Sequence, residues 1–280
     1  MTTKNLISLS LTEDLPNGDI TTQAIFATTP QMATAQFLAK QALVVSGWDI
    51  VQELIKIQFK KLKLKILKKN GVLVKSKTII GTVTGPIQEI LVFERLALNF
   101  LQHLSGVATH THAFVQKTKA TQTKILDTRK TLPGFRALEK QAVRHGGGHN
   151  HRQSLSDQYL IKDNHVDAAG SIKEALQLVF KHQKQAKKKA KIEIEVRNLT
   201  ELSQALMYQI DIVLLDNMTP KMVKRAVTLR DALAPKTQIE VSGGITLKNV
   251  AHYAKLRVDR ISVGAITHSS PAVDISLKIC

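Results

Sequence analysis

The chain has 280 residues, 43% of them hydrophobic, as expected for a globular protein with two domains or one barrel with an appendage. No apolar run approaches the roughly 20 residues that span a bilayer, so we do not expect a membrane protein. The first 15 residues lack the pattern of a secretory signal, so we do not expect a secreted protein. The single cysteine, Cys280, excludes an internal disulfide and indicates a reducing cytoplasm.

The formal net charge of +18 requires either an anionic partner or a basic surface that faces water. Removing twelve lysines lowers +18 to +6, and these lysines form two clusters: Lys60, Lys61, Lys63, Lys65, Lys68 and Lys69, then Lys181, Lys184, Lys187, Lys188, Lys189 and Lys191. Neither cluster contains interleaved aromatic residues that could stack on bases. We therefore favour solvated surfaces over a nucleic-acid or membrane role.

The first hundred residues predict mixed α and β structure. A polar stretch, 13–22, indicates a loop that leads into a helix, and residues 35–47 and 57–67 have the pattern of strands. Residues 81–86 are rich in turn formers, and Pro86 can open a helix because its missing N–H is unneeded there. This helix should run to about Ser105, where Gly106 interrupts it before a second helical stretch.

From residue 120 onward, short apolar runs alternate with amphipathic segments. The predicted strands are 124–127, 159–162, 191–196, 211–215, 237–241 and 260–263, and the main helical segments are 171–182, 200–208, 219–233 and 246–256. This alternation predicts a parallel sheet, closed as a barrel or open and doubly wound. Polar residues come directly after nearly every strand, which is typical of a barrel, so we expect an irregular α/β barrel with six countable strands.

The residues at these strand ends have the chemistry of an anion site. Ser242, Gly243 and Gly244 come after one strand, and Gly264 and Ala265 come after the next, where bare backbone N–H groups can bind phosphate. Basic side chains gather around other strand ends: Arg129, Lys130, Arg136, Lys140, His151, Arg152 and Lys162. Arginine grips carboxylates and phosphates with two N–H groups, so this set predicts a ligand with several anionic groups.

Two acidic residues, Glu195 and Asp216, end two further strands. They can hold ribose hydroxyls directly or through a divalent metal. The chain has no histidine and cysteine spacing that indicates zinc, and His145, His149 and His151 are too loosely arranged to do so.

Several long motifs carry a more specific signal: 13–22 (EDLPNGDITT), 94–99 (ERLALN), 104–106 (LSG), 127–136 (DTRKTLPGFR), 139–140 (EK), 146–152 (GGGHNHR), 161–166 (IKDNHV), 215–217 (LDN) and 241–246 (VSGGIT). Together they resemble the quinolinate phosphoribosyltransferase family, the carboxylating nicotinate-nucleotide pyrophosphorylases, over almost the whole chain. The resemblance implies an N-terminal α/β sandwich domain, residues 1–110, and an irregular α/β barrel, residues 111–265. The tail, 266–280, can return to the first domain.

The resemblance also assigns roles to single residues. It implies that Arg129, His151 and Arg152 bind the two carboxylates of quinolinate, together with Arg95 of the neighbouring subunit. The expected catalytic residues are Lys130, Lys162, Glu195 and Asp216, with the lysines near the pyrophosphate end of the co-substrate and the acids at the ribose and Mg²⁺. Ser242, Gly243 and Gly264 fall where the family binds the 5′-phosphate, and Gly244 and Ala265 complete the substrate-binding set.

The implied reaction is that of a cytoplasmic glycosyltransferase. It transfers phosphoribosyl from phosphoribosyl pyrophosphate to the ring nitrogen of quinolinate with loss of CO₂, giving nicotinate mononucleotide for NAD synthesis. The implied assembly is a homodimer with shared active sites, with a hexamer left open, and without nucleic-acid or membrane partners. Two alternatives remain: a relative of the same fold that acts on another aromatic acid, like proteins encoded beside molybdate transporters, and a basic nucleic-acid-binding protein. Gln141, where an aromatic is expected, and His145 and His149 leave fine specificity open.

Overall fold

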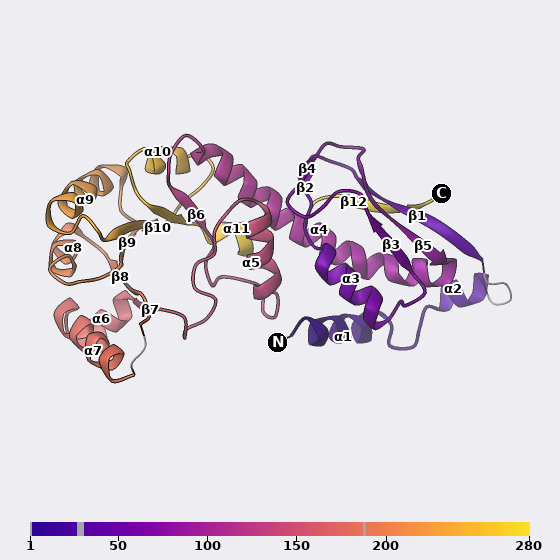
Figure 1. Ribbon diagram of the computed structural model, residues 1–280, viewed down its shortest axis with the longest axis horizontal. Helices are drawn as coiled ribbons and strands as arrows, with labels where there is room; N and C mark the ends of the chain where they lie inside the picture. Colours follow the sequence, from indigo (N-terminus) through magenta and orange to yellow (C-terminus); the bar gives the residue numbers. More distant parts are fainter. Residues whose placement is uncertain (1, 27–30, 187–188) are drawn as a thin grey trace. The chain divides into compact units, whose positions relative to one another are not determined.

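The computed structural model describes residues 2–26, 31–186 and 189–280 and divides the chain into two compact units (Figure 1). Unit 1 comprises Met1–His112, Thr131–Gly147 and Ile266–Cys280, and unit 2 comprises Ala113–Lys130 and Gly148–Ala265. Lys187 and Lys188 of the second basic cluster lie outside the described residues. Among the helices that are described, none combines the length and the hydropathy that crossing a bilayer requires.

Unit 1 is built on an antiparallel sheet with the strand order β12-β1-β5-β3. Its strands are β1 (Met32–Ala39), β3 (Lys63–Ile66), β5 (Ile79–Pro86) and β12 (Ile275–Ile279), and a small sheet pairs β2 (Leu43–Val44) with β4 (Leu73–Val74). The helices are α1 (Thr3–Asp14), α2 (Ile20–Ile25), α3 (Trp48–Ile57), α5 (Arg136–His145) and the first part of α4 (Ile87–Thr118). Trp48 of α3 and Phe93 of α4 both pack edge-on against Phe37 of β1. Helices on a sheet form the expected α/β sandwich.

Two strand predictions in unit 1 are wrong in extent. The first, 35–47, is divided, because β1 ends at Ala39 and β2 is a separate short strand. The second, 57–67, starts too early, because Ile57 ends α3, and only Lys63–Ile66 form β3. The amphipathic face of α3, with Trp48, Val51 and Leu54 buried, outweighs strand propensity at its last turn.

Three glycines misled the other predictions for unit 1. Residues 81–86 belong to strand β5 and not to a turn. A methyl group at Gly81 would lie 2.9 Å from the side chain of Trp48, and a methyl group at Gly85 would lie 2.6 Å from the side chain of Leu62. Helix α4 also continues through Gly106, where a methyl group would lie 2.2 Å from the carbonyl oxygen of Pro271. All three glycines therefore allow close packing inside regular elements.

Unit 2 contains a parallel sheet with the strand order β6-β11-β10-β9-β8-β7. The strands are β6 (Lys124–Leu126), β7 (Tyr159–Ile161), β8 (Ile192–Val196), β9 (Ile212–Asp216), β10 (Gln238–Ser242) and β11 (Arg260–Ser262). The first strand of this sheet, β6, pairs with its last, β11, and the two strands at the ends of the sheet, β6 and β7, do not pair with each other. This is the irregular barrel that the strand pattern predicts, and all six predicted strands are confirmed.

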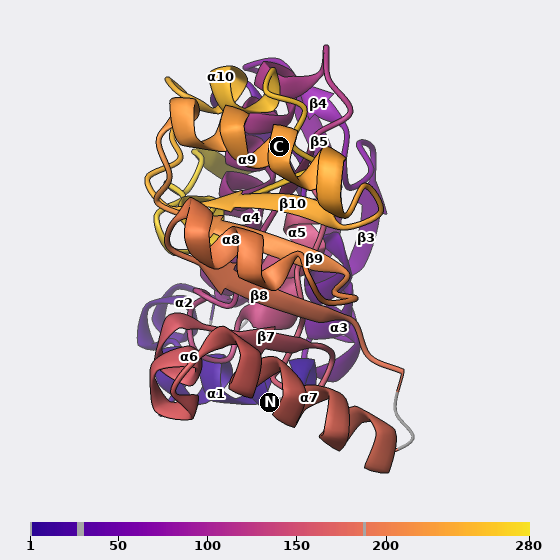
Figure 2. The same cartoon turned by 90° about the vertical axis from the view of Figure 1, so that its left-hand side faces the viewer.

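Helices cover the outside of this sheet. Figure 2 shows α6 (Asp163–Ala169), α7 (Ile172–Gln185), α8 (Leu199–Ala205) and α9 (Pro220–Leu233) in front of strands β7 to β10. Two shorter helices, α10 (Val250–Ala254) and α11 (Ala265–His268), come after β10 and β11. The prediction of a helix over 246–256 is therefore too long at both ends. Helix α6, which comes after β7, was not predicted, since its seven residues are too few to show a clear period.

Candidate active site

The carboxyl ends of the parallel strands in unit 2 carry most of the predicted site residues. Lys162 comes directly after β7, Asp216 ends β9 and Ser242 ends β10, with Asp216 and Ser242 directly paired. Because parallel strands end at the same edge of a sheet, these side chains share one edge with Glu195 of β8. Gly243, Gly244, Gly264 and Ala265 extend the same edge in the loops after β10 and β11.

Glu195 is the centre of a small charged group. Its Oε2 atom lies 3.5 Å from Nζ of Lys162. Burial raises the pKa of Glu195, Lys162 opposes this rise, and the negative charges of Asp216 and Asp163 add to it. Two carboxylates that repel each other beside a lysine are suited to binding a cation or sugar hydroxyls between them.

The loops after β9 and β10 are held together by Asn217. Its Nδ2 donates a hydrogen bond of 2.8 Å to Oδ2 of Asp216, and its backbone N–H donates one of 2.9 Å to the carbonyl of Ser242. Gly243, with φ of +91°, lies against it, since a methyl group at Gly243 would come within 2.2 Å of Oδ1 of Asn217. Asn217 had no role in the sequence analysis, although it belongs to the motif at 215–217.

The buried carboxylate of Asp127, two residues before Arg129, holds the segment 150–151 in place. The backbone N–H of His151 donates to Oδ1 of Asp127 over 2.8 Å, and Nδ2 of Asn150 donates to its Oδ2. Burial lowers the pKa of Arg152, and the positive charge of Arg129 lowers it further. Two guanidinium groups whose charges act on each other are complementary to an anion with more than one carboxylate.

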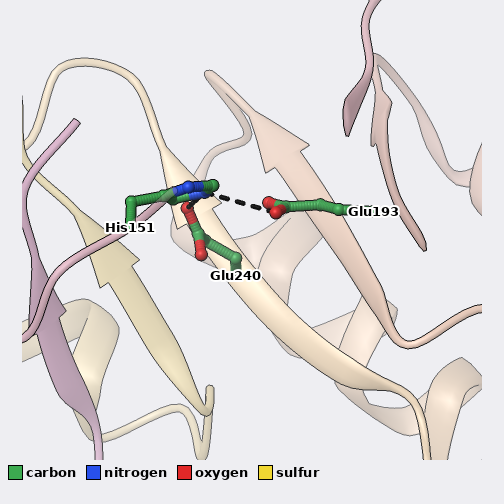
Figure 3. Close-up of side chains that lie close together, drawn as sticks. All are labelled: His151, Glu193 and Glu240. Carbon is green, nitrogen blue, oxygen red and sulfur yellow. Dashed lines mark ion pairs between the residues drawn. The ribbon is translucent and has the colours of Figure 1, made fainter. Parts of the chain in front are cut away.

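His151 lies between two buried glutamates of the barrel interior, as Figure 3 shows. Its Nε2 atom is 3.2 Å from Oε2 of Glu193 in β8 and 3.3 Å from Oε1 of Glu240 in β10. Burial alone would lower the pKa of His151, and the two carboxylates raise it. A second ring proton would, however, remove the lone pair of Nδ1 that accepts the N–H of Arg152. Arg260 donates through Nε to Oε2 of Glu240 over 2.7 Å, and this charge helps to keep the pKa of the buried Glu240 low.

The sequence analysis missed Glu193 and Glu240. One signal was available: each glutamate stands between two apolar residues of its strand, Ile192 and Ile194 in β8 and Ile239 and Val241 in β10. A glutamate in such a strand needs a partner, but the sequence does not show that the partner is His151, some 40 to 90 residues away.

The ligand atoms of His151, Glu193 and Glu240 lie within 4.8 Å of one another, which raises the question of a metal ion. However, Nδ1 of His151 accepts the backbone N–H of Arg152 over 2.8 Å. The ring proton must then be on Nε2, the atom that would have to bind the metal. This cluster does not fit a metal, whereas Glu195 and Asp216 offer the oxygen ligands that Mg²⁺ prefers.

The remaining candidates divide between the units. Lys130 is exposed at the end of its unit 2 segment, where its N–H donates to Oγ1 of Thr128 over 3.0 Å. Arg95, Arg136 and Lys140 belong to unit 1: Arg95 is exposed on α4, Arg136 donates through Nε to Thr131, and Lys140 is fully buried on α5. Of these, only Lys130 shares unit 2 with the residues at the strand ends.

A pocket of about 640 Å³ also lies in unit 2, along β7, α6 and α7. It is lined largely by apolar side chains, among them Leu160, Ala168 and Leu178. Arg152 is the one predicted site residue in its lining, so the charged groups at the strand ends lie outside it.

Comparison with known proteins identifies the family of the chain. Residues 19–105 match the family described as quinolinate phosphoribosyl transferase, N-terminal domain, and residues 107–278 match the C-terminal domain. The nicotinate-nucleotide pyrophosphorylase (carboxylating) of Mycobacterium leprae is 40% identical over 281 residues, which cover 99% of this chain and 96% of that protein.

Solved structures give the same result. The nicotinate-nucleotide pyrophosphorylase from Francisella tularensis has a TM-score of 0.90 at 39% identity and covers 99% of this chain and 96% of its own. The one from Ehrlichia chaffeensis has a TM-score of 0.92 at 36% identity and covers 100% of this chain and 99% of its own. Fold, motifs and full-length similarity all agree, and the chain belongs to the quinolinate phosphoribosyltransferase family.

Proposed function

We propose that this chain carries out the reaction of its family with the residues gathered at the strand ends of unit 2. The ring nitrogen of quinolinate attacks C1 of phosphoribosyl pyrophosphate, pyrophosphate leaves, and the C2 carboxylate then departs as CO₂. The observation that carries this proposal is the shared edge of the parallel sheet, where Asp216 pairs with Ser242 and Nζ of Lys162 lies 3.5 Å from Oε2 of Glu195.

Different basic residues bind the two substrates. Arg129 and Arg152 bind the carboxylates of quinolinate beside His151, and Lys130 and Lys162 neutralise the pyrophosphate as it leaves. Such stabilisation matters most in the transition state, when negative charge develops on the leaving group. After transfer, the positive ring nitrogen stabilises the electron pair that stays on C2 when CO₂ leaves, and C2 then takes up a proton from solvent. The protein therefore need only hold the substrates in place.

The acidic pair and the glycine loops hold the phosphoribosyl group. Glu195 and Asp216 bind the ribose hydroxyls and would hold Mg²⁺, which would supply positive charge to stabilise the leaving pyrophosphate. Ser242, Gly243, Gly244, Gly264 and Ala265 receive the 5′-phosphate on their backbone N–H groups. Phosphate sites of barrels are commonly built after the last two strands, as β10 and β11 are here.

We further propose a homodimer in which Arg95 reaches the quinolinate site of the partner subunit. Arg95 is exposed on a helix whose next three residues are buried. A two-fold dimer gives two such crossed sites, and a hexamer would be an assembly of these dimers. We place the enzyme in the cytoplasm, where Cys280, exposed and free, would remain reduced.

The substrate test compares quinolinate with nicotinate, which has one carboxylate fewer. With phosphoribosyl pyrophosphate and Mg²⁺, we expect CO₂ release from quinolinate. We expect kcat/KM for nicotinate to be at least about 100-fold lower, because nicotinate offers the half-buried Arg129 and Arg152 one anionic group fewer to bind. Comparable values for the two acids would falsify the dicarboxylate site, and no reaction with quinolinate would reject the proposed function itself.

A further inference from the structure

The interior of the barrel contains a chain of contacts that ends at Arg152. Glu193 and Glu240 are both fully buried, and each uses one oxygen for a fixed partner. Nε2 of Gln158 donates to Oε2 of Glu193, and Nε of Arg260 donates to Oε2 of Glu240. These contacts hold the two carboxylates on either side of Nε2 of His151, at 3.2 and 3.3 Å.

The second ring nitrogen of His151 faces a backbone donor. Nδ1 accepts the N–H of Arg152 over 2.8 Å, and this contact requires a lone pair on Nδ1. The two carboxylates require a proton on Nε2. The contacts of both ring nitrogens thus require the same tautomer, with the proton on Nε2. Both nitrogens have their partners within the protein.

We propose that Glu193 and Glu240 are positioning residues, which hold the Nε2 proton of His151 and so leave Nδ1 to fix the backbone of Arg152. The inference rests on the proposed function, in which Arg152 binds a carboxylate of quinolinate. His151 then acts on the substrate through Arg152. Since Arg129 repels Arg152, a fixed backbone keeps the second guanidinium in place before the dicarboxylate arrives.

The kinetic test uses Glu193→Gln and Glu240→Gln, which keep the size of the side chain and remove its charge. We expect KM for quinolinate to rise on the order of tenfold in each, with KM for phosphoribosyl pyrophosphate nearly unchanged, because only Arg152 loses its support. The matched control is Glu201→Gln, which removes a glutamate paired with the exposed Arg197 at 2.9 Å. An unchanged KM for quinolinate, or an equal rise for both substrates, would overturn the proposal.

A spectroscopic test needs no folded variant of either glutamate. Long-range ¹H–¹⁵N spectra of the wild-type enzyme, labelled at histidine and assigned with His151→Asn, report which ring nitrogen carries a proton. We expect Nε2 of His151 to be protonated and Nδ1 to be bare. A proton on Nδ1, in a charged ring or in the other tautomer, would overturn the proposal. This result is independent of turnover, so an enzyme inactive on quinolinate would reject the proposed function without deciding the state of His151.

Discussion

Gly243 is a position where the absence of a side chain shapes the phosphate loop. Its φ of +91° is a conformation that residues with a Cβ rarely adopt. It also lies against Asn217, whose Nδ2 is hydrogen-bonded to Asp216. A side chain at Gly243 would have to displace Asn217, and this displacement would reach the carboxylate that we assign to the ribose and Mg²⁺.

We therefore expect Gly243→Ala to raise KM for phosphoribosyl pyrophosphate on the order of tenfold or more, while KM for quinolinate changes less. The matched control is Gly170→Ala. Gly170 has φ of +95° at the end of α6, but a methyl group there meets nothing within 4 Å. Both variants carry about 1 kcal/mol of backbone strain, so only the contact with Asn217 distinguishes them. Steady-state kinetics of the two variants check this, and equal values of KM would count against the loop assignment.

At the scale of single residues, the sequence predicts the chemistry at the end of a strand better than the chemistry inside it. Asp216 and Ser242 were found because each ends an apolar run, and parallel strands bring their ends together. Glu193 and Glu240 were missed because their common partner, His151, comes from a loop that no local pattern links to β8 or β10. Gln141 and His145 show the same limit: they bind Asp49 and Ser46, and these contacts depend on the tertiary structure of unit 1.

Among the elements, helix α4 shows why a glycine can mislead. Gly106 lies within a continuous helix because the C-terminal segment crosses it, with the carbonyl of Pro271 where a methyl group would lie. That segment is held on α4 by two hydrogen bonds, from the N–H of Val273 to Gln102 and from Gln102 to the carbonyl of Ile275. The sequence shows a glycine at position 106, but only the fold shows that the C-terminal segment packs against it.

We expect Gly106→Ala to lower the free energy of unfolding by about 1–3 kcal/mol, because backbone atoms of the C-terminal segment would have to move. The higher helix propensity of alanine, worth about 1 kcal/mol, offsets this only in part. The control is Gln116→Ala, an exposed substitution on the same helix. Chemical denaturation of both variants measures the difference in the free energy of unfolding. A Gly106→Ala protein as stable as the control would show that the C-terminal segment moves aside at no cost, and would contradict this prediction.

Two lysines of the first cluster are explained at the same scale. β3 is an edge strand of the unit 1 sheet, and Lys63 and Lys65 are exposed on it. Lysines on an edge strand discourage pairing with the edge of another molecule. The alternation of lysine with leucine and isoleucine predicted a half-buried strand correctly, but the position of that strand in the sheet is set by the topology.

For the whole molecule, the barrel could be predicted because its evidence is local and repeated. Five of the six apolar runs have polar residues directly after them, and helical segments separate most of the runs. The gap between β6 and β7 could not be predicted, because there the chain leaves unit 2 at Lys130 and returns at Gly148. Strand counting alone does not reveal such an excursion.

The division of candidate residues between the units leads to the last prediction, which concerns the dimer. Arg95 belongs to unit 1, whereas Arg129, Arg152 and Lys162 belong to unit 2. If Arg95 acts across the dimer, Arg95→Ala and Lys130→Ala subunits, each inactive alone, should restore activity when mixed. A mixed dimer has one intact site and one doubly defective site, so random exchange restores about a quarter of all sites.

The control for this experiment mixes Lys130→Ala with Asp216→Ala. Both residues belong to unit 2, so every site of a mixed dimer keeps one defect and activity should stay absent. Mass spectrometry of differently labelled subunits must first demonstrate that exchange occurs. Since Arg95 is exposed and its proposed role is to bind a ligand, its loss should leave the unfolding transition of the chain unchanged. Exchange without any recovery would place Arg95 outside the partner's site and contradict the shared dimer.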